Sequence, residues 1–273
     1  MQYIDTHIHT NFSFDGTNTP DEICAAAAAA GLSAIAITDH FDADGIYEGF
    51  YSPYAGAKAK ELILKAREKY APGLRVAFGL EIGQPYAYPD QCEAMIGELN
   101  FDFIIGSLHN LMRTPDFCFL KFDNMPQLLI ERLWERSLEE TYTLLLEYKG
   151  LKINTLGHLT YPIRYIKRAG RELDLKRYYD SVSQIYRKLT QYGIALEVNT
   201  SGLRQGAGMT LPDTDLLSLY RECGGELLTV GSDAHKAADA GADIPFVYDM
   251  LADLGFGYVT FFMEGKPEFI KIK

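Results

Sequence analysis

The six histidines of this chain share one kind of position. They are His7, His9, His40, His109, His158 and His235, and each lies at or just beyond the C-terminal end of a predicted β-strand. Strand ends make up a small fraction of an ordinary domain, so chance does not readily place every histidine there. Any one of them, taken alone, would be interpreted as a satisfied polar residue near the core. The set as a whole predicts a shared site.

Acidic residues follow the same pattern. The carboxylates at predicted strand ends are Asp5, Asp39, Glu81 and Asp233, and Asp15 lies in the loop after the first strand. Imidazole and carboxylate groups together form ligand sets that suit zinc, iron or manganese. The sequence therefore predicts a metal site, and this ligand chemistry does not choose among the three metals.

The spacing within two segments strengthens the prediction. His7 and His9 are separated by one residue, and alternate residues of an extended segment point to the same side. Asp233 and His235 repeat the arrangement. A single His-x-His pair is a weak signal of a metal site, but six strand-end segments that each carry a histidine or a carboxylate, in this order, form a strong one. They are HIH (7–9), TDH (38–40), GLEIG (79–83), GSLH (106–109), LGH (156–158) and GSDAH (231–235).

Short apolar strands alternate with amphipathic helices, and these elements must position the histidines. The predicted strands are residues 3–5, 34–38, 75–83, 101–109, 152–159, 194–200, 227–233 and 258–262. Predicted helices cover 55–70, 125–148 and 174–193, and another begins after Thr19, in a capping box with Glu22, and ends at Gly31. Seven or eight parallel βα units favour a closed α/β barrel. All its strands end on one face, where active sites lie.

Composition bounds the class of protein. The chain has 273 residues, 47% of them hydrophobic, and no repeat, low-complexity tract or linker, so we interpret residues 1–273 as a single domain. Its formal net charge of −11 argues against nucleic acid or an anionic membrane as a partner. No apolar run approaches the roughly 18 residues of a membrane span, and the N-terminus lacks signal-peptide features. With four widely spaced cysteines, this predicts a cytoplasmic protein with reduced thiols.

These segments also resemble those of a known family. The chain is similar to the PHP (polymerase and histidinol phosphatase) superfamily, and within it to the monofunctional histidinol-phosphatase branch. The likeness covers nearly the whole chain and rests on DTHIHT (5–10), ITDH (37–40), GLEIG (79–83), GSLH (106–109), GHL (157–159), EVNTSGLR (197–204) and GSDAH (231–235). It implies a distorted (β/α)7 TIM-like barrel of the PHP type, with three divalent metal ions at the strand ends. Zinc is the first expectation for them, with iron or manganese as alternatives.

The resemblance also implies a ligand set. One metal would be held by His7, His9, Glu81 and Asp233, a second by Asp15, His40 and His235, and a third by His109 and His158 with Glu81 bridging. Asp15 stands where some relatives carry a histidine.

The chemistry expected of such a site is hydrolysis of a small phosphate monoester. A water bridging two metals loses its proton near neutral pH and becomes the nucleophile. Arginine offers a bidentate fork to phosphate oxygens, and Arg164 and Arg204 both follow strands of the barrel. Ser201 could add a hydroxyl donor that Asn199 orients. The alternative for each arginine is an ordinary solvated loop residue. The leaving group's proton could come from a metal-bound water, from Asp233 or from His235.

Several other residues keep two interpretations. Asp39 is either an outer acceptor that fixes the tautomer of a ligand histidine or a structural cap, and Asp5 could act similarly on His7 or His9. Tyr86 and Tyr88 either line the substrate pocket or stand on an exposed loop. The irregular loop over residues 110–124 has the character of a substrate-contacting segment.

The resemblance leaves the substrate open. It implies hydrolysis of L-histidinol phosphate by a metal-bridging hydroxide, as in histidine biosynthesis. Relatives often carry an acidic residue two positions after the histidine that corresponds to His158, but here Thr160 stands there, and the loop after His109 also departs from the expected form. The alternatives are another small ester, such as a sugar or nucleotide phosphate, and a non-catalytic module stabilised by metal. Nothing in the sequence decides the oligomeric state.

Overall fold

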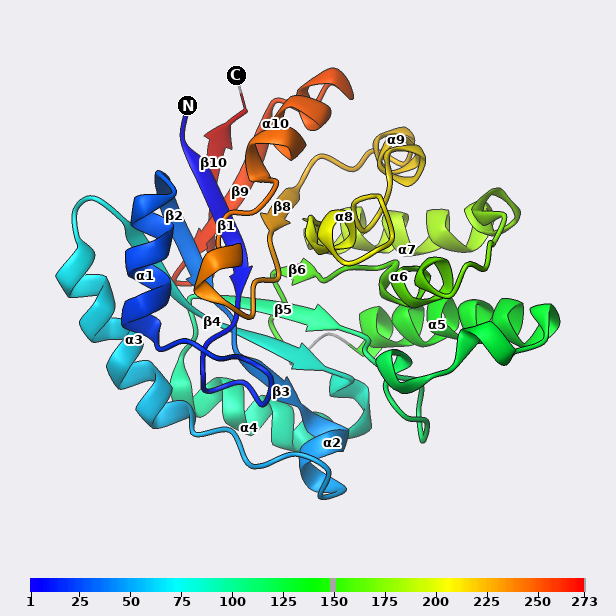
Figure 1. Cartoon of the computed structure of the whole chain (residues 1–273), viewed down its shortest axis with the longest axis horizontal. Coiled ribbons are helices and arrows are strands. Elements are labelled where there is room, and N and C mark those ends of the chain that lie inside the picture. The colour runs from blue at the N-terminus through cyan, green and yellow to red at the C-terminus, as the bar shows by residue number, and fades with distance from the viewer. Residues whose placement is uncertain (148–150, 273) are drawn as a thin grey trace.

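A mostly parallel sheet, nearly closed into a barrel, forms the centre of the molecule (Figure 1). The structure is a computed structural model that describes residues 1–147 and 151–272. Along the sheet the strands run in the order β1-β2-β4-β5-β6-β7-β8, and β3 pairs with β4. Their bounds are β1 Tyr3–Ile8, β2 Leu32–Ile37, β3 His40–Asp42, β4 Arg75–Gly83, β5 Phe103–Ser107, β6 Thr155–Leu156, β7 Ala195–Asn199 and β8 Leu228–Gly231. This architecture confirms the predicted distorted TIM-like barrel.

The barrel closes where its first and last strands meet. Ile8 and Ala234 form a parallel bridge, and the Asp233 N–H donates to the His7 carbonyl at 2.8 Å. The His9 N–H donates to the Ala234 carbonyl, also at 2.8 Å. Closure therefore lies at the carboxyl ends of both strands and sets segment 7–9 beside segment 233–235.

Helices cover the outside of the sheet (Figure 1). The α-helices are α1 Pro20–Ala29, α2 Ala43–Tyr47, α3 Gly56–Tyr70, α4 Pro89–Leu99, α5 Gln127–Glu147, α6 Tyr161–Arg168, α7 Tyr179–Tyr192, α8 Ser201–Arg204, α9 Thr214–Glu222 and α10 Ile244–Asp253. The predicted capping box is confirmed, because Thr19 and Glu22 bond to each other's backbone N–H groups. Of the predicted helix 125–148, residue 148 lies outside the described residues.

Short 3-10 turns connect several of these elements. Their bounds are η1 Pro85–Ala87, η2 Phe117–Phe119, η3 Phe122–Asn124, η5 Leu175–Tyr178 and η6 Ala237–Asp239. Two of them, η2 and η3, lie in the irregular loop 110–124 that follows β5. Within the described ranges, no helix is long and apolar enough to cross a bilayer.

The last predicted strand has a different role from the one expected. Strand β9 (Tyr258–Met263) pairs antiparallel with β10 (Lys266–Lys271) in a separate two-stranded sheet. The expectation that it continues the parallel series is wrong. Glu264 and Gly265 both have positive φ, of 52° and 71°, as the two central residues of a tight hairpin turn require. The chain therefore reverses at once and makes no further crossover.

Candidate metal centre and active site

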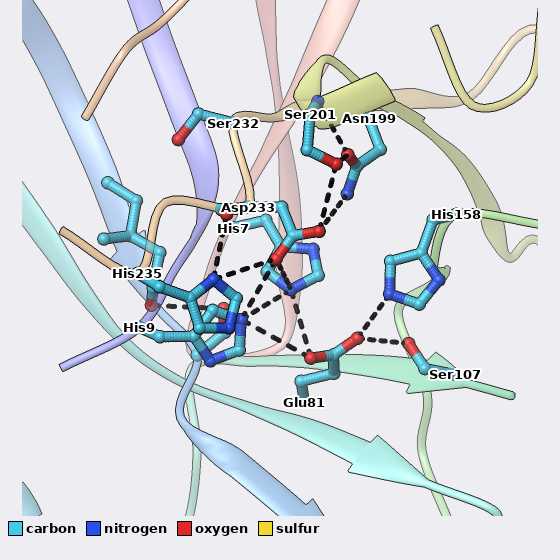
Figure 2. A network of polar contacts seen from close by, with 12 residues as sticks. His7, His9, Glu81, Ser107, His158, Asn199, Ser201, Ser232, Asp233 and His235 are labelled. Atoms are coloured by element: carbon cyan, nitrogen blue, oxygen red, sulfur yellow. Dashed lines mark hydrogen bonds and ion pairs between the residues drawn. The ribbon is translucent and has the colours of Figure 1, made fainter. Parts of the chain in front are cut away.

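Glu81 stands at the centre of the mouth of the barrel, and its two oxygens face different histidines (Figure 2). It lies near the end of β4 and is fully buried. Its Oε1 is 2.8 Å from His158 Nε2 and 3.1 Å from His109 Nε2. Its Oε2 is 3.2 Å from His7 Nε2 and 3.0 Å from His40 Nδ1. The Glu81 carboxylate thus connects separate groups of the histidine cluster.

The first group, His7, His9 and Asp233, combines segments from near the two ends of the chain. His7 Nε2 and His9 Nε2 are 3.0 Å apart, which confirms that the His-x-His spacing turns both rings to one side. Asp233 Oδ1 lies 3.6 Å from His9 Nε2 and 3.9 Å from His7 Nε2. Asp233 itself has a φ of 54°, a left-handed conformation uncommon outside glycine and found at functional sites. The barrel closure described above makes this grouping possible.

A second group lies nearer to solvent. His235 Nε2 is 3.1 Å from Asp15 Oδ2, and His40 Nε2 is 3.7 Å from Asp15 Oδ1. The His9 ring lies 4.2 Å from the rings of both His40 and His235, centroid to centroid, and those two rings are 5.7 Å apart. The structure therefore brings Asp15 to the histidines, although its side chain is 43% exposed.

A third group surrounds Oε1 of Glu81. His109 Nε2 and His158 Nε2 are 3.4 Å apart, and both rings point at the same carboxylate oxygen. Ser107 also donates to Oε1, at 2.6 Å. Ser107 therefore supports Glu81 from a fully buried position and does not line the cavity.

The cluster has the properties of a cation site. Four overlapping groups bring potential ligand atoms within 4.8 Å of one another, namely His7–His9–Asp233, His7–Glu81–His158, His9–His40–His235 and His40–Asp42–His109. Glu81 Oε2, His40 Nδ1 and His235 Nε2 are buried, and within the described part of the chain their polar neighbours lie at ion-pair distance without forming a well-oriented hydrogen bond. Buried polar atoms normally form oriented hydrogen bonds, so facing ligand atoms without one fit divalent cations bound between them.

Electrostatics supports the same interpretation. Burial alone would raise the pKa of Glu81, but attraction to His7, His109 and His40 holds that pKa well below its usual range. Burial lowers the pKa of the His9 imidazole, and repulsion from His235 and His40 lowers it further. The pKa values of His7, His40 and His109 are instead raised, because attraction to nearby carboxylates outweighs burial. Metal binds the anionic carboxylate and the neutral imidazole, so a bound cation would displace the protons of these three rings.

Two outer carboxylates that sequence reasoning missed orient histidine rings of the cluster. Glu197 on β7 accepts a bond from His7 Nδ1 at 2.6 Å, and Asp42 on β3 accepts one from His109 Nδ1 at 2.9 Å. Each bond leaves Nε2 of its histidine facing inward, the arrangement that typically supports metal-bound histidine. Gly83 and Gly231 allow these contacts, because a Cβ at Gly83 would collide with Asp42 and one at Gly231 with the Cβ of His7.

The residues predicted around phosphate fall into two positions. Arg164 and Arg204 line the cavity, and neither is a solvated surface residue. Arg164 donates to Asp233 Oδ2 at 3.1 Å, and Arg204 donates to the backbone carbonyls of Ser232 and Asp233 at 2.6 and 3.0 Å.

Asn199 and Ser201 lie fully buried behind Asp233. Asn199 Nδ2 is 3.4 Å and Ser201 Oγ 3.2 Å from Asp233 Oδ2. Ser201 also accepts a bond from Arg164 Nη2 at 2.6 Å. Their contacts therefore fix the orientation of the Asp233 carboxylate and of the arginine that pairs with it.

The other aspartates act through the backbone and through a serine. Asp39 accepts bonds from Thr10 N and from Ser13 Oγ, and Ser13 Oγ is 3.1 Å from His9 Nδ1. Asp39 thus reaches a histidine only through Ser13, while it also fixes the loop after β1. Asp5 accepts bonds from the backbone N–H groups of residues 7, 232 and 241 and touches no imidazole.

A cavity of about 390 Å³ opens above the cluster. Beside the histidines and arginines, its lining includes Phe14, Tyr51, Asp116, Phe119 and Tyr161. Tyr86, Tyr88 and Thr160 are not among the residues that line it. Tyr86 instead donates to Glu140 at 2.7 Å. Asp116 and Phe119 come from loop 110–124, so that loop does form a wall of the cavity.

Comparison with known proteins identifies the family. A model of the PHP domain matches residues 5–201 of the chain. The chain belongs to the PHP domain family. This PHP chain is 30% identical over 264 residues to the protein named "Probable histidinol-phosphatase" of Thermotoga maritima, a match that covers 96% of each chain. It is 25% identical over 244 residues to the histidinol-phosphatase of Lactococcus lactis, covering 87% of this chain and 86% of the other.

The fold of this PHP chain has a close counterpart among solved structures. The crystal structure of histidinol phosphate phosphatase from Lactococcus lactis, complexed with zinc, L-histidinol and phosphate, superposes with a TM-score of 0.80. The superposition covers 98% of this chain and 99% of the other, at 22% identity. The likeness confirms the barrel architecture over its full length.

Proposed function

We propose that this protein is a metal-dependent phosphomonoesterase that hydrolyses L-histidinol phosphate to L-histidinol and phosphate. The observation that carries the proposal is the cluster of six histidines around Glu81, with the buried Arg164 and the partly buried Arg204 beside it in one cavity. The curated relatives that match most of the chain are named histidinol-phosphatases, which supports this choice of substrate.

We propose that the cluster holds three divalent cations, with zinc as the first choice. The first would be bound by His7, His9, Glu81 and Asp233, the second by Asp15, His40 and His235, and the third by His109, His158 and Glu81. The two oxygens of Glu81 support the separation of the third cation from the other two, since Oε1 faces His109 and His158 while Oε2 faces His7 and His40. Asp233 and His235 lie beyond residue 201 yet complete the cluster, which favours residues 1–273 as one domain.

The residues of the cavity have complementary tasks. Bound cations would supply a Lewis acid for the phosphoryl oxygens and would lower the pKa of a water in the site. Arg164 and Arg204 present guanidinium groups that bind the remaining phosphoryl oxygens and offset the charge that develops on them. Asn199 and Ser201 hold Asp233 and Arg164 in place, so that these groups need not reorganise when the substrate enters.

The test is phosphate release from a panel of esters by the purified protein. Histidinol phosphate is expected to be hydrolysed much faster than sugar or nucleotide monophosphates. A preference for one of those esters would support a phosphomonoesterase activity but overturn histidinol phosphate as the substrate. Absence of hydrolysis of every ester by metal-loaded protein would overturn the enzymatic function and favour a non-catalytic module.

Glu197→Gln tests the orienting role of the outer carboxylate. Glu197 accepts bonds from His7 Nδ1 and from the His158 backbone N–H, and glutamine would turn its amide nitrogen toward one of these donors. Such outer contacts are typically worth about 10- to 100-fold in metal affinity, so we expect a loss of that size in a chelator competition. The exposed Glu226→Gln is the matched control. Equal affinities in both variants would contradict the role.

A further inference from the structure

Asp116 occupies the junction between two cavities. It lies in loop 110–124 and lines both the cavity above the histidines and a neighbouring one of about 470 Å³. Tyr51 and Phe119 line both cavities as well. A molecule whose phosphate sits at the histidine cluster could therefore extend past Asp116 into the second cavity.

The carboxylate of Asp116 has an unused oxygen. Its Oδ1 accepts bonds from the Cys118 backbone N–H at 2.6 Å and from the Tyr161 hydroxyl at 3.1 Å. Its Oδ2 has no hydrogen-bond partner, and no lysine, arginine or histidine pairs with Asp116 within the described residues. Burial raises the pKa of this carboxyl, and attraction to His109 offsets that effect only in part.

Arg164, which lines the same cavity, does not pair with Asp116. Tyr161 lies between, with its ring under the Arg164 guanidinium at 5.0 Å and its hydroxyl on Asp116. Arg164 is turned instead toward Asp233 and Ser201. The two ends of the cavity therefore carry opposite charges. The arginines lie beside the histidine cluster, and the Asp116 carboxylate, with its unpaired Oδ2, lies at the outer end.

Aromatic side chains surround this outer end. The rings of Phe14 and Tyr51 stack at a centroid distance of 4.0 Å, and Phe14 also stacks on His40. Phe50 and Phe119, 75% and 64% exposed, stand on the wall of the second cavity. The second cavity is also lined by Asp44, Glu48 and Arg113, and Asp44 already accepts bonds from Gln84 and Asn110. Aromatic faces with a surplus of carboxylates suit a cationic group attached to a flat or apolar body.

We propose that Asp116 is a specificity-determining residue that binds the positive charge of the leaving alcohol, so that the enzyme selects phosphate esters of cationic alcohols. The inference rests on the proposed phosphomonoesterase function and deepens it. The phosphate would be held by the arginines and the metal cluster, the ammonium by Asp116 Oδ2, and the rest of the alcohol by the aromatic walls.

A pair of esters that differ only in the ammonium group tests this directly. Phenylalaninol phosphate carries it and 3-phenylpropyl phosphate lacks it, while both keep the ring and the phosphate. The wild-type protein is expected to prefer the first in kcat/KM, as it prefers histidinol phosphate. Asp116→Asn should lower kcat/KM for both ammonium esters by about 10- to 100-fold, the range of a charged hydrogen bond, and leave 3-phenylpropyl phosphate unchanged.

Controls separate this role from a structural one. Asparagine can still accept the Cys118 bond, so the turn that Asp116 caps should persist. Asp123→Asn changes an exposed carboxylate of the same loop and should leave kcat/KM unchanged for both kinds of ester. Equal effects of Asp116→Asn on both esters, or no effect on either, would overturn the inference while the phosphatase stands. A wild-type protein that hydrolyses none of the esters would instead overturn the proposed function.

Discussion

Replacing Glu81 by glutamine is expected to abolish most of the activity and to reduce the bound metal. Glutamine has the same shape but no charge. Its amide nitrogen would face either His158 or His40, where a carboxylate oxygen now lies. Outer carboxylates of such sites are worth about 10- to 100-fold, so loss of the shared central one should cost about 10³-fold or more in kcat/KM. Steady-state kinetics and elemental analysis of the same preparation measure both effects.

The exposed Glu98→Gln serves as the control for this change. Circular dichroism of the Glu81→Gln protein would show whether the barrel remains folded. A folded variant with wild-type metal content and rate would contradict the central place given to Glu81. A folded variant that loses metal and rate together would support it.

Arg164→Lys is expected to lower kcat/KM by about 10²- to 10³-fold, the range for removing one donor that stabilises developing charge. Lysine keeps the positive charge but loses the planar fork that now contacts Gln205, Ser201 and Asp233. The inhibition constant of inorganic phosphate should rise in parallel.

Metal content separates this role from a purely structural one. It should stay at the wild-type value, because Arg164 contacts Asp233 through Oδ2, while Oδ1 faces the histidines. Arg168→Lys, on the same helix and outside the cavity lining, is the matched control. Loss of metal with unchanged inhibition by phosphate would contradict phosphate binding by Arg164.

The histidine cluster could be predicted from sequence because strand ends carry a strong pattern. Apolar runs that stop at a histidine or carboxylate mark both the strand and its end, and parallel strands bring all such ends to one face. His7 and His9 illustrate this, since their spacing alone places both rings on one side. The same argument located Glu81, His109 and His158 without any knowledge of their distances.

The outer contacts could not be predicted in the same way, because they depend on which strands become neighbours in space. Glu197 is distant in sequence from His7 and His158 and meets them only in the closed barrel. The available signal was a charge with apolar neighbours on both sides within strand 195–199, since a buried carboxylate needs a partner. Asp42 had a similar signal, two residues after His40 in an extended segment.

Loop geometry was the other limit of sequence reasoning. The pattern predicted that 110–124 is irregular but could not show that Asp116 faces the cavity, because loop conformation follows from tertiary contacts such as the Tyr161 bond. The arginines were expected near the mouth of the barrel, yet how far they are buried depends on partners from segments 201–205 and 232–233, which lie far from Arg164 in sequence. Strand 258–262 was recognised, but its pairing depended on a two-residue turn at Glu264 and Gly265.

Metal content measured together with activity tests the central claim most directly. We predict about three divalent cations per chain in protein purified without chelator, loss of histidinol phosphate hydrolysis when they are removed, and recovery when zinc or manganese is returned. Protein that binds no metal under any loading condition, or that hydrolyses the ester equally well after complete removal of metal, would contradict the account.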